Sequence, residues 1–346
     1  MKRTVKININ YANKNKLQTI DDIFTEAKSV INKYINLLWD TNNVNDKFVS
    51  QKVDTWLSAR MQQALGKQAL EIIKSQRKRL KKTKPIFNKE VINLDSRFID
   101  IQFDNNSFDI WIKLTSIGNK INLKLPSKKH KLYHKYKHWD LLKSVRLVKQ
   151  HNNYFIELFF DKKEPMKQQT NKKVAIDIGY KKLITSSNKN IYNGDLQQIY
   201  DKISRAKQGS KGFKRALKHR DNETNKLINE FIKNEEPSVL YVEDLKNVKH
   251  KSKLSKKVMN KVQRWIYSRV LSKLDYLSEQ MGILLVKVSP EYTSQICNGC
   301  GVIDKRNRQG ELYRCSTCGY ENDADINAAL NIFTRGVYSP SATVSI

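Results

Sequence analysis

The stretch SPEYTSQICNGCGVIDKRNRQGELYRCSTCGYENDADINAALNI, from Ser289 to Ile332, decides the fold of this chain. It contains all four cysteines, arranged as two Cys-x2-Cys pairs with fourteen residues between them: Cys297, Cys300, Cys315 and Cys318. Four thiolates at this spacing are typical of a structural zinc site with tetrahedral coordination, and the glycine after each pair suits a tight turn beneath a metal. Two disulfides or four unrelated core cysteines are the alternatives, but nothing in the chain suggests a secreted protein.

Composition points to a folded, strongly basic protein. The chain has 346 residues and 39% hydrophobic content, which is enough for more than one core. Lys and Arg number 65 against 34 Asp and Glu, a formal charge of +31. Such an excess favours a polyanionic partner, and nucleic acid is the most direct one. A basic surface kept for solubility is the alternative, although the charges cluster in runs.

The sequence predicts neither a membrane span nor a leader peptide. No apolar run reaches the roughly 18 residues of a spanning helix. The N-terminal residues MKRTVKININ lack the apolar centre of a signal peptide. We therefore expect an intracellular protein, cytoplasmic or associated with the nucleoid, that has no membrane partner.

The N-terminal part predicts one strand followed by helices. Residues Arg3 to Asn10 alternate apolar and polar side chains, as in a half-buried strand. An amphipathic helix is predicted from Thr19, a candidate N-cap, and a second one from about Val53 to Lys82. Residues 1–18 thus provide a first strand, and residues 19–90 a helical domain.

The second of these helices has a strongly basic end. Seven of the eleven residues from Lys74 to Lys84 are Lys or Arg. A helix end of this kind can lie along a phosphate backbone. The candidate contacts are Lys74, Arg77, Lys78, Arg79, Lys81 and Lys82.

Residues 91–170 predict a small antiparallel barrel or sandwich. Apolar residues recur at every second position from about Arg97, and turns are expected at Asn105-Asn106 and around Asn152-Asn153. Between strands, the segment PSKKHKLYHKYKHWD mixes basic and aromatic residues, which suits phosphates and unstacked bases. The alternative is that its aromatic rings merely close the barrel. The candidate contacts are Lys128, Lys129, Lys131, Tyr133 and Tyr136.

A second domain of alternating strands and helices is predicted from Asn171. One buried strand ends in Asp177, another ends in Glu243, and a third covers about Ile283 to Val288. Short strands that each end in an acid concentrate carboxylates at one sheet edge. The helical segment between the first two strands is basic, and its candidate nucleic-acid contacts are Lys211, Lys214 and Arg215.

The acids of this domain suggest a site for divalent metal. Two Mg²⁺ ions need several hard oxygen ligands, which Asp177, Glu243 and an acid after the cysteines can supply. Acids at strand ends are common, so position alone leaves this open. We expect Asp325 rather than Asp323 to complete the set, because Asp325 shares a helix flank with small and apolar residues, whereas Asp323 lies where the helix begins and can cap it. Interaction with the helix macrodipole is the alternative for Asp325.

Four motifs carry a resemblance to a known family. AIDIGYKKL, YVEDLKNV, SPEYTSQICNGCG and DADINAALNI, in this order, resemble the three RuvC motifs and the inserted zinc ribbon of TnpB, a transposon-encoded family of RNA-guided nucleases related to compact type V CRISPR effectors. The resemblance implies that Asp177, Glu243 and Asp325 hold two catalytic Mg²⁺ ions. It also implies that the four cysteines hold one structural Zn²⁺.

The resemblance further implies a multidomain α+β architecture. An N-terminal antiparallel wedge barrel with a helical recognition insertion would precede an RNase H-like RuvC domain over residues 171–290. A zinc ribbon would occupy residues 291–322 and a final RuvC helix residues 323–334. We expect the tail, residues 335–346, to be loosely ordered.

The activity implied by the resemblance is Mg²⁺-dependent, RNA-guided DNA cleavage. Its partners would be a guide RNA and a target DNA with a short flanking motif, and base pairing would read the target sequence. The presence of all three acids favours this over a non-cleaving RNA-guided repressor. An unguided nuclease acting on single strands or junctions is the third candidate. The sequence does not decide whether the protein forms a homodimer.

Overall fold

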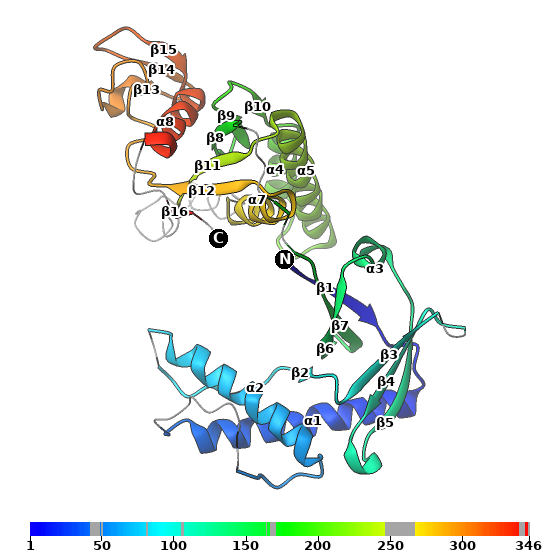
Figure 1. Cartoon of the computed structure of the whole chain (residues 1–346). Helices are drawn as coiled ribbons and strands as arrows, with labels where there is room; N and C mark the ends of the chain where they lie inside the picture. Colours follow the sequence, from blue (N-terminus) through cyan, green and yellow to red (C-terminus); the bar gives the residue numbers. More distant parts are fainter. Residues whose placement is uncertain are drawn as a thin grey trace. The chain divides into compact units, whose positions relative to one another are not determined.

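In the computed structural model, the chain divides into two units, Met1–Lys163 and Glu164–Ile346, which we describe separately (Figure 1). The structure describes all residues except 42–48, 50, 81, 105–106, 164, 167–170, 246–266, 339–342 and 345–346. Both units combine helices and sheets, so the fold is mixed α/β and multidomain. Among the described helices, none has the length and apolar character needed to cross a membrane.

The described strands of unit 1 form two antiparallel sheets. The larger has the order β1-β7-β6-β2, from Lys2–Asn8, Asn153–Asp161, Asp140–Gln150 and Val91–Leu94. The smaller has the order β3-β4-β5, from Ile99–Phe103, Ile110–Thr115 and Asn122–Ser127. Their inner faces share one hydrophobic core. The antiparallel strands expected here are present, while closure into a wedge barrel stays a prediction.

Side-chain alternation explains the larger sheet. Val5, Ile7 and Ile9 are fully buried, as the predicted first strand requires. The hairpin between β6 and β7 is also confirmed, with His151 and Asn152 in its turn at φ values of 49° and 60°. Two residues with positive φ suit the right-handed twist of a hairpin. The turn predicted at Asn105-Asn106 lies outside the described residues, although β3 and β4 do pair.

The first helix begins earlier than predicted. Helix α1 covers Lys14–Leu38, and its N-cap is Asn13, whose Oδ1 accepts a hydrogen bond from the Lys16 amide at 3.0 Å. The predicted N-cap at Thr19 is therefore wrong, and its hydroxyl instead donates to the Asn15 carbonyl inside the helix. Asn and Thr both suit a cap, but packing of Leu17 on the core extends the apolar stripe toward Asn13.

The second helix is shorter than predicted. Helix α2 covers Ala59–Arg77, with Ser58 as its N-cap, whereas we expected a helix from Val53 to Lys82. The basic run continues past the helix end, and neighbouring like charges disfavour further helical turns there. Two short helical segments complete unit 1: η1 at Ile117–Asn119 and α3 at Lys131–Tyr136.

Unit 2 is built on a six-stranded sheet. Its order is β10-β9-β8-β11-β12-β16, from Ile191–Tyr192, Ile184–Ser186, Lys173–Asp177, Val239–Glu243, Leu284–Val288 and Thr343–Val344. The three central strands β8, β11 and β12 are parallel. Parallel strands bring their carboxyl ends to the same edge, so Asp177 and Glu243 end side by side.

Helices cover both faces of this sheet (Figure 1). On one face lie α4, α5 and α7, which cover Leu196–Arg205, Lys211–Glu235 and Tyr267–Met281. On the other lies α8, Ala324–Tyr338. Burial alternates accordingly: Leu240 and Val242 of β11 join the first core, and Tyr241 joins the second. Burial on both faces explains why these strands read as continuous apolar runs.

A buried carboxylate fastens the β9–β10 hairpin to α5. Glu235 accepts hydrogen bonds from Ser186 at 2.8 Å, Asn188 at 2.6 Å, Asn190 at 2.9 Å and Tyr192 at 3.3 Å. Burial alone would raise the pKa of Glu235, but these donors outweigh it and lower the pKa. The stability that they contribute is therefore present above the ordinary Glu pKa and is lost as the pH falls through the lowered value.

The last helix extends further than predicted. We expected residues 335–346 to be loose, but α8 continues to Tyr338, and Thr343–Val344 pair with β12, while the rest of this tail lies outside the described residues. Gly336 explains the close approach of α8 to the sheet, because a Cβ at this position would lie 2.2 Å from Cδ1 of Tyr241. A larger side chain does not fit between this helix and β11.

We predict that Gly336→Ala destabilises unit 2. The added methyl group must displace Tyr241 or α8, which should cost about 1–3 kcal/mol of unfolding free energy in urea titrations. Gly212→Ala in α5 is the matched control, since its nearest neighbour would be the Ser210 hydroxyl at 3.8 Å. That change should be neutral or stabilising by up to about 1 kcal/mol. Equal effects at the two positions would contradict the close packing of α8.

Candidate functional site

The four cysteines converge on one point. Their sulfur atoms all lie within 4.8 Å of one another. Sγ of Cys297 is 3.7 Å from Sγ of Cys318, and Sγ of Cys300 is 3.7 Å from Sγ of Cys315. A tetrahedral ion with Zn–S bonds of about 2.3 Å holds its sulfurs roughly 3.8 Å apart, whereas a disulfide needs about 2.05 Å. The cluster therefore fits Zn²⁺, and disulfide pairing is excluded for these free thiols.

Two equivalent turns position the thiols. The amide of Gly301 donates to the Cys297 carbonyl at 2.8 Å, and the amide of Gly319 donates to the Cys315 carbonyl at 3.0 Å. Both glycines have positive φ, 78° and 75°, as the predicted turns require. The backbone amides of Cys318 and Thr317 face the sulfur of Cys315 and lower the pKa of this thiol. Such a thiol is readily available as the thiolate that binds metal.

The cysteine turns and a small sheet form a ribbon attached to α8. Its strands are β13 at Arg308–Gln309, β14 at Leu312–Arg314 and β15 at Glu321–Asp323. Asn327 of α8 is fully buried, accepts from the Asn298 amide at 3.1 Å and donates to the Ile296 carbonyl at 2.8 Å. Asn331, one turn further, donates to the Thr293 and Ile296 carbonyls. These bonds fix the ribbon on the helix that carries Asp325.

We predict that Cys300→Ser removes zinc and destabilises the ribbon. The Cys300 side chain is exposed, so without a metal its replacement would cost almost nothing. Loss of a structural metal should instead lower the unfolding free energy by more than about 2 kcal/mol. Elemental analysis and thermal unfolding measure both effects, with Thr317→Ser as the control. Wild-type protein that contains no zinc as isolated and is no more stable than Cys300→Ser would refute a zinc site.

Three carboxylates meet at the sheet edge of unit 2. Asp177 is the last residue of β8, Glu243 is the last residue of the adjacent β11, and Asp325 lies in the first turn of α8. Burial raises the pKa of Asp177 to about 8, with further contributions from the charges of Glu243 and Asp325. Glu243 and Asp325 are thus both near enough to Asp177 for their charges to act on it.

The raised pKa has a defined effect on stability. Because the folded-state pKa of Asp177 lies above the ordinary value, the stability linked to its proton is greatest at acidic pH. It falls as the pH rises toward 8 in the metal-free protein. Burial also raises the pKa of Glu243, while the Thr293 hydroxyl, which donates a hydrogen bond to its carboxylate, opposes this shift. Both acids therefore gain from positive charge in the site.

Two cations that sequence reasoning missed provide positive charge. Nη2 of Arg308 lies 2.7 Å from Oδ1 of Asp325, and Nζ of Lys182 lies 3.6 Å from its Oδ2. The positive charge of Arg308 also acts against the rise in the pKa of Asp177 and of Glu243. Lys182 follows Asp177 by five residues, which could have drawn attention to it. No local pattern distinguishes Arg308 from its basic neighbours in the ribbon.

The two aspartates after the ribbon differ as predicted in their backbone contacts. Oδ1 of Asp323 accepts from the amides of Asp325 at 2.9 Å and Ile326 at 3.3 Å, so the predicted capping role is confirmed. Its carboxylate also pairs with Lys182. The carboxylate of Asp325 instead forms ion pairs with Arg308 and Lys182. The charge of Asp325 also contributes to the raised pKa of Asp177, which is consistent with the prediction that Asp325 belongs with the other acids.

The chemistry of these side chains fits a hard divalent cation. Carboxylate oxygens are the ligands that Mg²⁺ prefers, and three of them share a half-buried edge. Among the described residues, the four cysteines form the one group of metal-ligating side chains whose ligand atoms all lie within 4.8 Å of one another. The carboxylate oxygens of the three acids are therefore farther apart than the cysteine sulfurs. Arg308 and Lys182 occupy part of the space around them.

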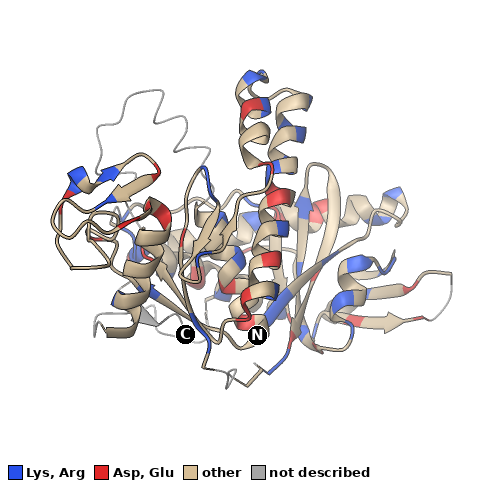
Figure 2. Ribbon diagram, turned by 90° about the horizontal axis from the view of Figure 1, so that it is seen from above, with Lys and Arg blue, Asp and Glu red and all other residues tan. Residues whose placement is uncertain are grey.

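The candidate nucleic-acid contacts separate into exposed and occupied residues. Lys and Arg are distributed over both units (Figure 2). Exposed candidates are Lys74, Lys78, Arg79, Lys82, Lys128, Lys131, Lys211, Lys214 and Arg215, whereas Lys81 lies outside the described residues. Arg77 instead donates to the Thr41 carbonyl at 2.9 Å and lies over the Trp39 ring, which fixes the end of α1. Lys129 pairs with Asp104.

The predicted base contacts of Tyr133 and Tyr136 are wrong. Both side chains are buried, with exposed fractions of 8% and 5%. Tyr133 packs edge-on against Phe160 at 5.9 Å, and Tyr136 against Trp139 at 5.0 Å. The alternative interpretation of this segment, that its aromatic rings pack on the protein core instead of binding bases, therefore applies to these two rings.

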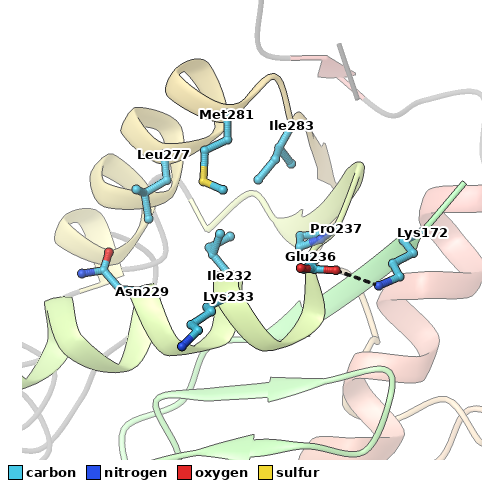
Figure 3. Close-up of a pocket in the computed structure, with 9 residues that line it drawn as sticks. All are labelled: Lys172, Asn229, Ile232, Lys233, Glu236, Pro237, Leu277, Met281 and Ile283. Atoms are coloured by element: carbon cyan, nitrogen blue, oxygen red, sulfur yellow. Dashed lines mark hydrogen bonds and ion pairs between the residues drawn. The ribbon is translucent and has the colours of Figure 1, made fainter. Parts of the chain in front are cut away.

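A pocket of about 490 Å³ lies at the other end of the central strands (Figure 3). Lys172, Pro237 and Ile283 precede β8, β11 and β12, and they line it together with the ends of α5 and α7. Asp177 and Glu243 lie at the opposite ends of the same strands. The pocket is thus separate from the carboxylates.

Comparison with known proteins identifies relatives of this chain. Residues 267–332 match the family model described as Cas12f1-like, TNB domain. The chain is 34% identical to the CRISPR-associated endodeoxyribonuclease Cas12f1 of Sulfoacidibacillus thermotolerans, over 40% of this chain and 29% of that protein. It is 31% identical to a TnpB-like protein of Aquifex aeolicus, over 32% of this chain and 36% of that protein. The matches thus span about a third of these relatives.

A solved structure shares the fold. The chain in a Cas12f1–sgRNA–target DNA complex aligns with 99% of this chain and 99% of its own length, at a TM-score of 0.57 and 14% identity. A further relative is the putative RNA-guided DNA endonuclease InsQ of Escherichia coli, 36% identical over 26% of this chain and 22% of that protein. Both kinds of comparison lead to the same group of proteins.

Proposed function

We propose that this chain, which is similar to TnpB-like proteins and to Cas12f1, is an RNA-guided DNA endonuclease. The observation that supports the proposal is that Asp177, Glu243 and Asp325 come from three elements to one sheet edge, where burial and the charges of the other two acids raise the pKa of Asp177. Carboxylates held this way are suited to cations and phosphodiester chemistry. A repressor without cleavage would not need them.

Each residue of the site has a proposed task. Asp177, Glu243 and Asp325 would hold two Mg²⁺ ions, which when bound supply an acidified water and neutralise charge on the cleaved phosphate. Asp177 gives up its proton when it acts as a ligand, because only the carboxylate binds the metal. Thr293 orients Glu243 by its hydrogen bond, and Lys182 and Arg308 orient Asp325.

The remaining parts would bind nucleic acid and support the site. We assign unit 1 to the wedge and recognition domains, residues 171–290 with the final helix to a RuvC domain, and residues 291–322 to a zinc ribbon that holds one Zn²⁺. The exposed basic residues would hold the guide RNA and its heteroduplex with target DNA through the backbone. A short flanking motif in the DNA would be read by the protein itself.

We predict that the protein binds RNA when isolated from its native host and cuts DNA complementary to that RNA. After sequencing the bound RNA, cleavage is measured with matched and mismatched targets in Mg²⁺. Asp177→Ala should abolish cutting, by at least about a hundredfold, because it removes one metal ligand. Its RNA and DNA binding should stay unchanged.

The alternatives give distinct outcomes in the same assay. Tight guided binding without cleavage by the wild type would identify a repressor, and cleavage without RNA would identify an unguided nuclease. Loss of RNA binding in Asp177→Ala would show that this residue serves folding rather than chemistry.

We predict opposite effects at the two aspartates of the last motif. Asp325→Ala should leave the protein folded and catalytically dead, because Asp325 faces the other acids. Asp323→Ala should still cut but lose about 1 kcal/mol of stability, because it removes a helix cap. Cleavage of one target by equally RNA-loaded variants, together with urea unfolding, tests both. The reverse pattern would overturn the assignment.

A further inference from the structure

The outer face of the β1-β7-β6-β2 sheet carries a row of interacting polar side chains. Lys6, Glu157, Arg146 and Asn93 occupy the same level of the register on the four strands. Glu157 is bound on both sides, by Lys6 at 3.3 Å and by Arg146 at 3.2 Å. Nε of Arg146 also donates to Asn93 at 3.1 Å. The guanidinium group is therefore held in one orientation on the sheet surface.

Two phenylalanines flank this row on the central strand β7. Phe155 and Phe159 lie two residues before and after Glu157, so their side chains project to the same face. They are partly exposed, whereas the intervening Ile156 and Leu158 are fully buried. Nζ of Lys6 lies 5.4 Å from the centre of the Phe155 ring, and the guanidinium carbon of Arg146 lies 5.5 Å from that of Phe159. Each ring is thus paired with a cation.

A basic hollow adjoins Phe159. This cavity of about 730 Å³ is lined by Phe159, Arg146 and residues of α2 that include Lys67 and Lys74. Within the described part of the chain, neither of these lysines forms an ion pair. Two acids, Glu71 and Asp95, also line the hollow, against the four cations Lys67, Lys74, Arg97 and Arg146, and Arg97 pairs with Asp95 at 2.6 Å. The lining therefore has an excess of positive charge beside an aromatic ring.

We propose that this surface, formed by Phe155, Phe159, Lys6 and Arg146 and here named the stacking face, binds unpaired nucleotides of RNA. Aromatic rings on an open sheet and fixed guanidinium planes both stack nucleobases, whatever their sequence. The adjoining Lys67 and Lys74 would hold the phosphates of the same strand. The proposal rests on the proposed function only in requiring that the chain binds nucleic acid. DNA offers the same bases and phosphates, so the test includes it.

Charge distribution favours nucleic acid over an apolar partner for this face. Cations lie over both rings, and Glu157, the acid between the rings, is neutralised by two of them. An apolar protein surface or a lipid chain would bury these charged groups without compensation, which is costly. A nucleotide instead presents a flat base to the rings and an anion to the lysines. The arrangement thus matches the two chemical parts of a nucleotide.

The first experiment separates stacking from simple packing. Full-length protein, freed of co-purified nucleic acid, is titrated with fluorescein-labelled oligouridylate and, in parallel, oligodeoxythymidylate. Phe159→Leu keeps an apolar side chain but loses the aromatic face, and should weaken RNA binding about fivefold to tenfold. Phe159→Trp should bind within about twofold of the wild type. Equal affinity of the Leu and Trp variants would overturn the stacking face, as would exclusive binding of the DNA probe.

Salt dependence tests the hollow separately. Lys67→Gln should reduce the slope of log Kd against log salt by about one, because one phosphate contact is lost, whereas Phe159→Leu should leave this slope unchanged. An unchanged slope in Lys67→Gln would remove the hollow from the site.

Photocrosslinking provides a readout that needs no variant. Wild-type protein bound to 4-thiouridine RNA should crosslink in the peptide that contains Phe155 or Phe159, and crosslinks confined to other peptides would overturn the proposal. Failure of the wild type to bind either probe would instead refute the proposed nucleic-acid function itself. RNA binding that persists in Phe159→Leu refutes only the stacking face.

Discussion

Burial of carboxylates at one sheet edge is the constraint around which the candidate site of unit 2 is built. Parallel pairing of β8 with β11 forces Asp177 and Glu243 to end at one edge, and α8 adds Asp325. A second buried acid shows that burial alone does not decide the outcome. Glu235 keeps a lowered pKa because four neutral donors bind it, whereas burial of Asp177, with acids rather than donors for neighbours, raises its pKa to about 8. The first arrangement stabilises the fold, and the second favours a bound cation.

The ribbon and the carboxylates are coupled through shared elements. Arg308, which contacts Asp325, lies between the two cysteine pairs, so the thiolate cluster fixes the loop that supplies this cation. The buried amides of Asn327 and Asn331 join the ribbon to α8, the helix that begins with the third acid. Gly336 then allows the same helix to lie against Tyr241 of β11. Order in the cysteine cluster therefore bears on the position of Asp325, although the cysteines do not contact it.

Local patterns predicted the parts of the site that local chemistry determines. Cysteine spacing predicted the thiolate cluster, and the start of α8 predicted capping by Asp323. Strand ends placed Asp177 and Glu243 at one edge, since apolar runs reveal buried parallel strands. Sequence could not predict Arg308 beside Asp325, because that contact depends on how the ribbon folds back. The helix start at Asn13 was missed for a similar reason, since packing chose between two suitable caps.

Strand β7 shows why surface aromatic residues are difficult to recognise from sequence. Both of its faces carry aromatic rings. The alternation of side chains along the strand places Tyr154 and Phe160 on one face and Phe155 and Phe159 on the other, but it does not show which face is buried. The core settles this, since Phe160 packs against Tyr133. Tyr133 looked like a base contact only because lysines surround it in the sequence. Strand register identifies such residues better than sequence alternation does. It places Arg146 beside Glu157, and the guanidinium group of Arg146 lies over the partly exposed ring of Phe159.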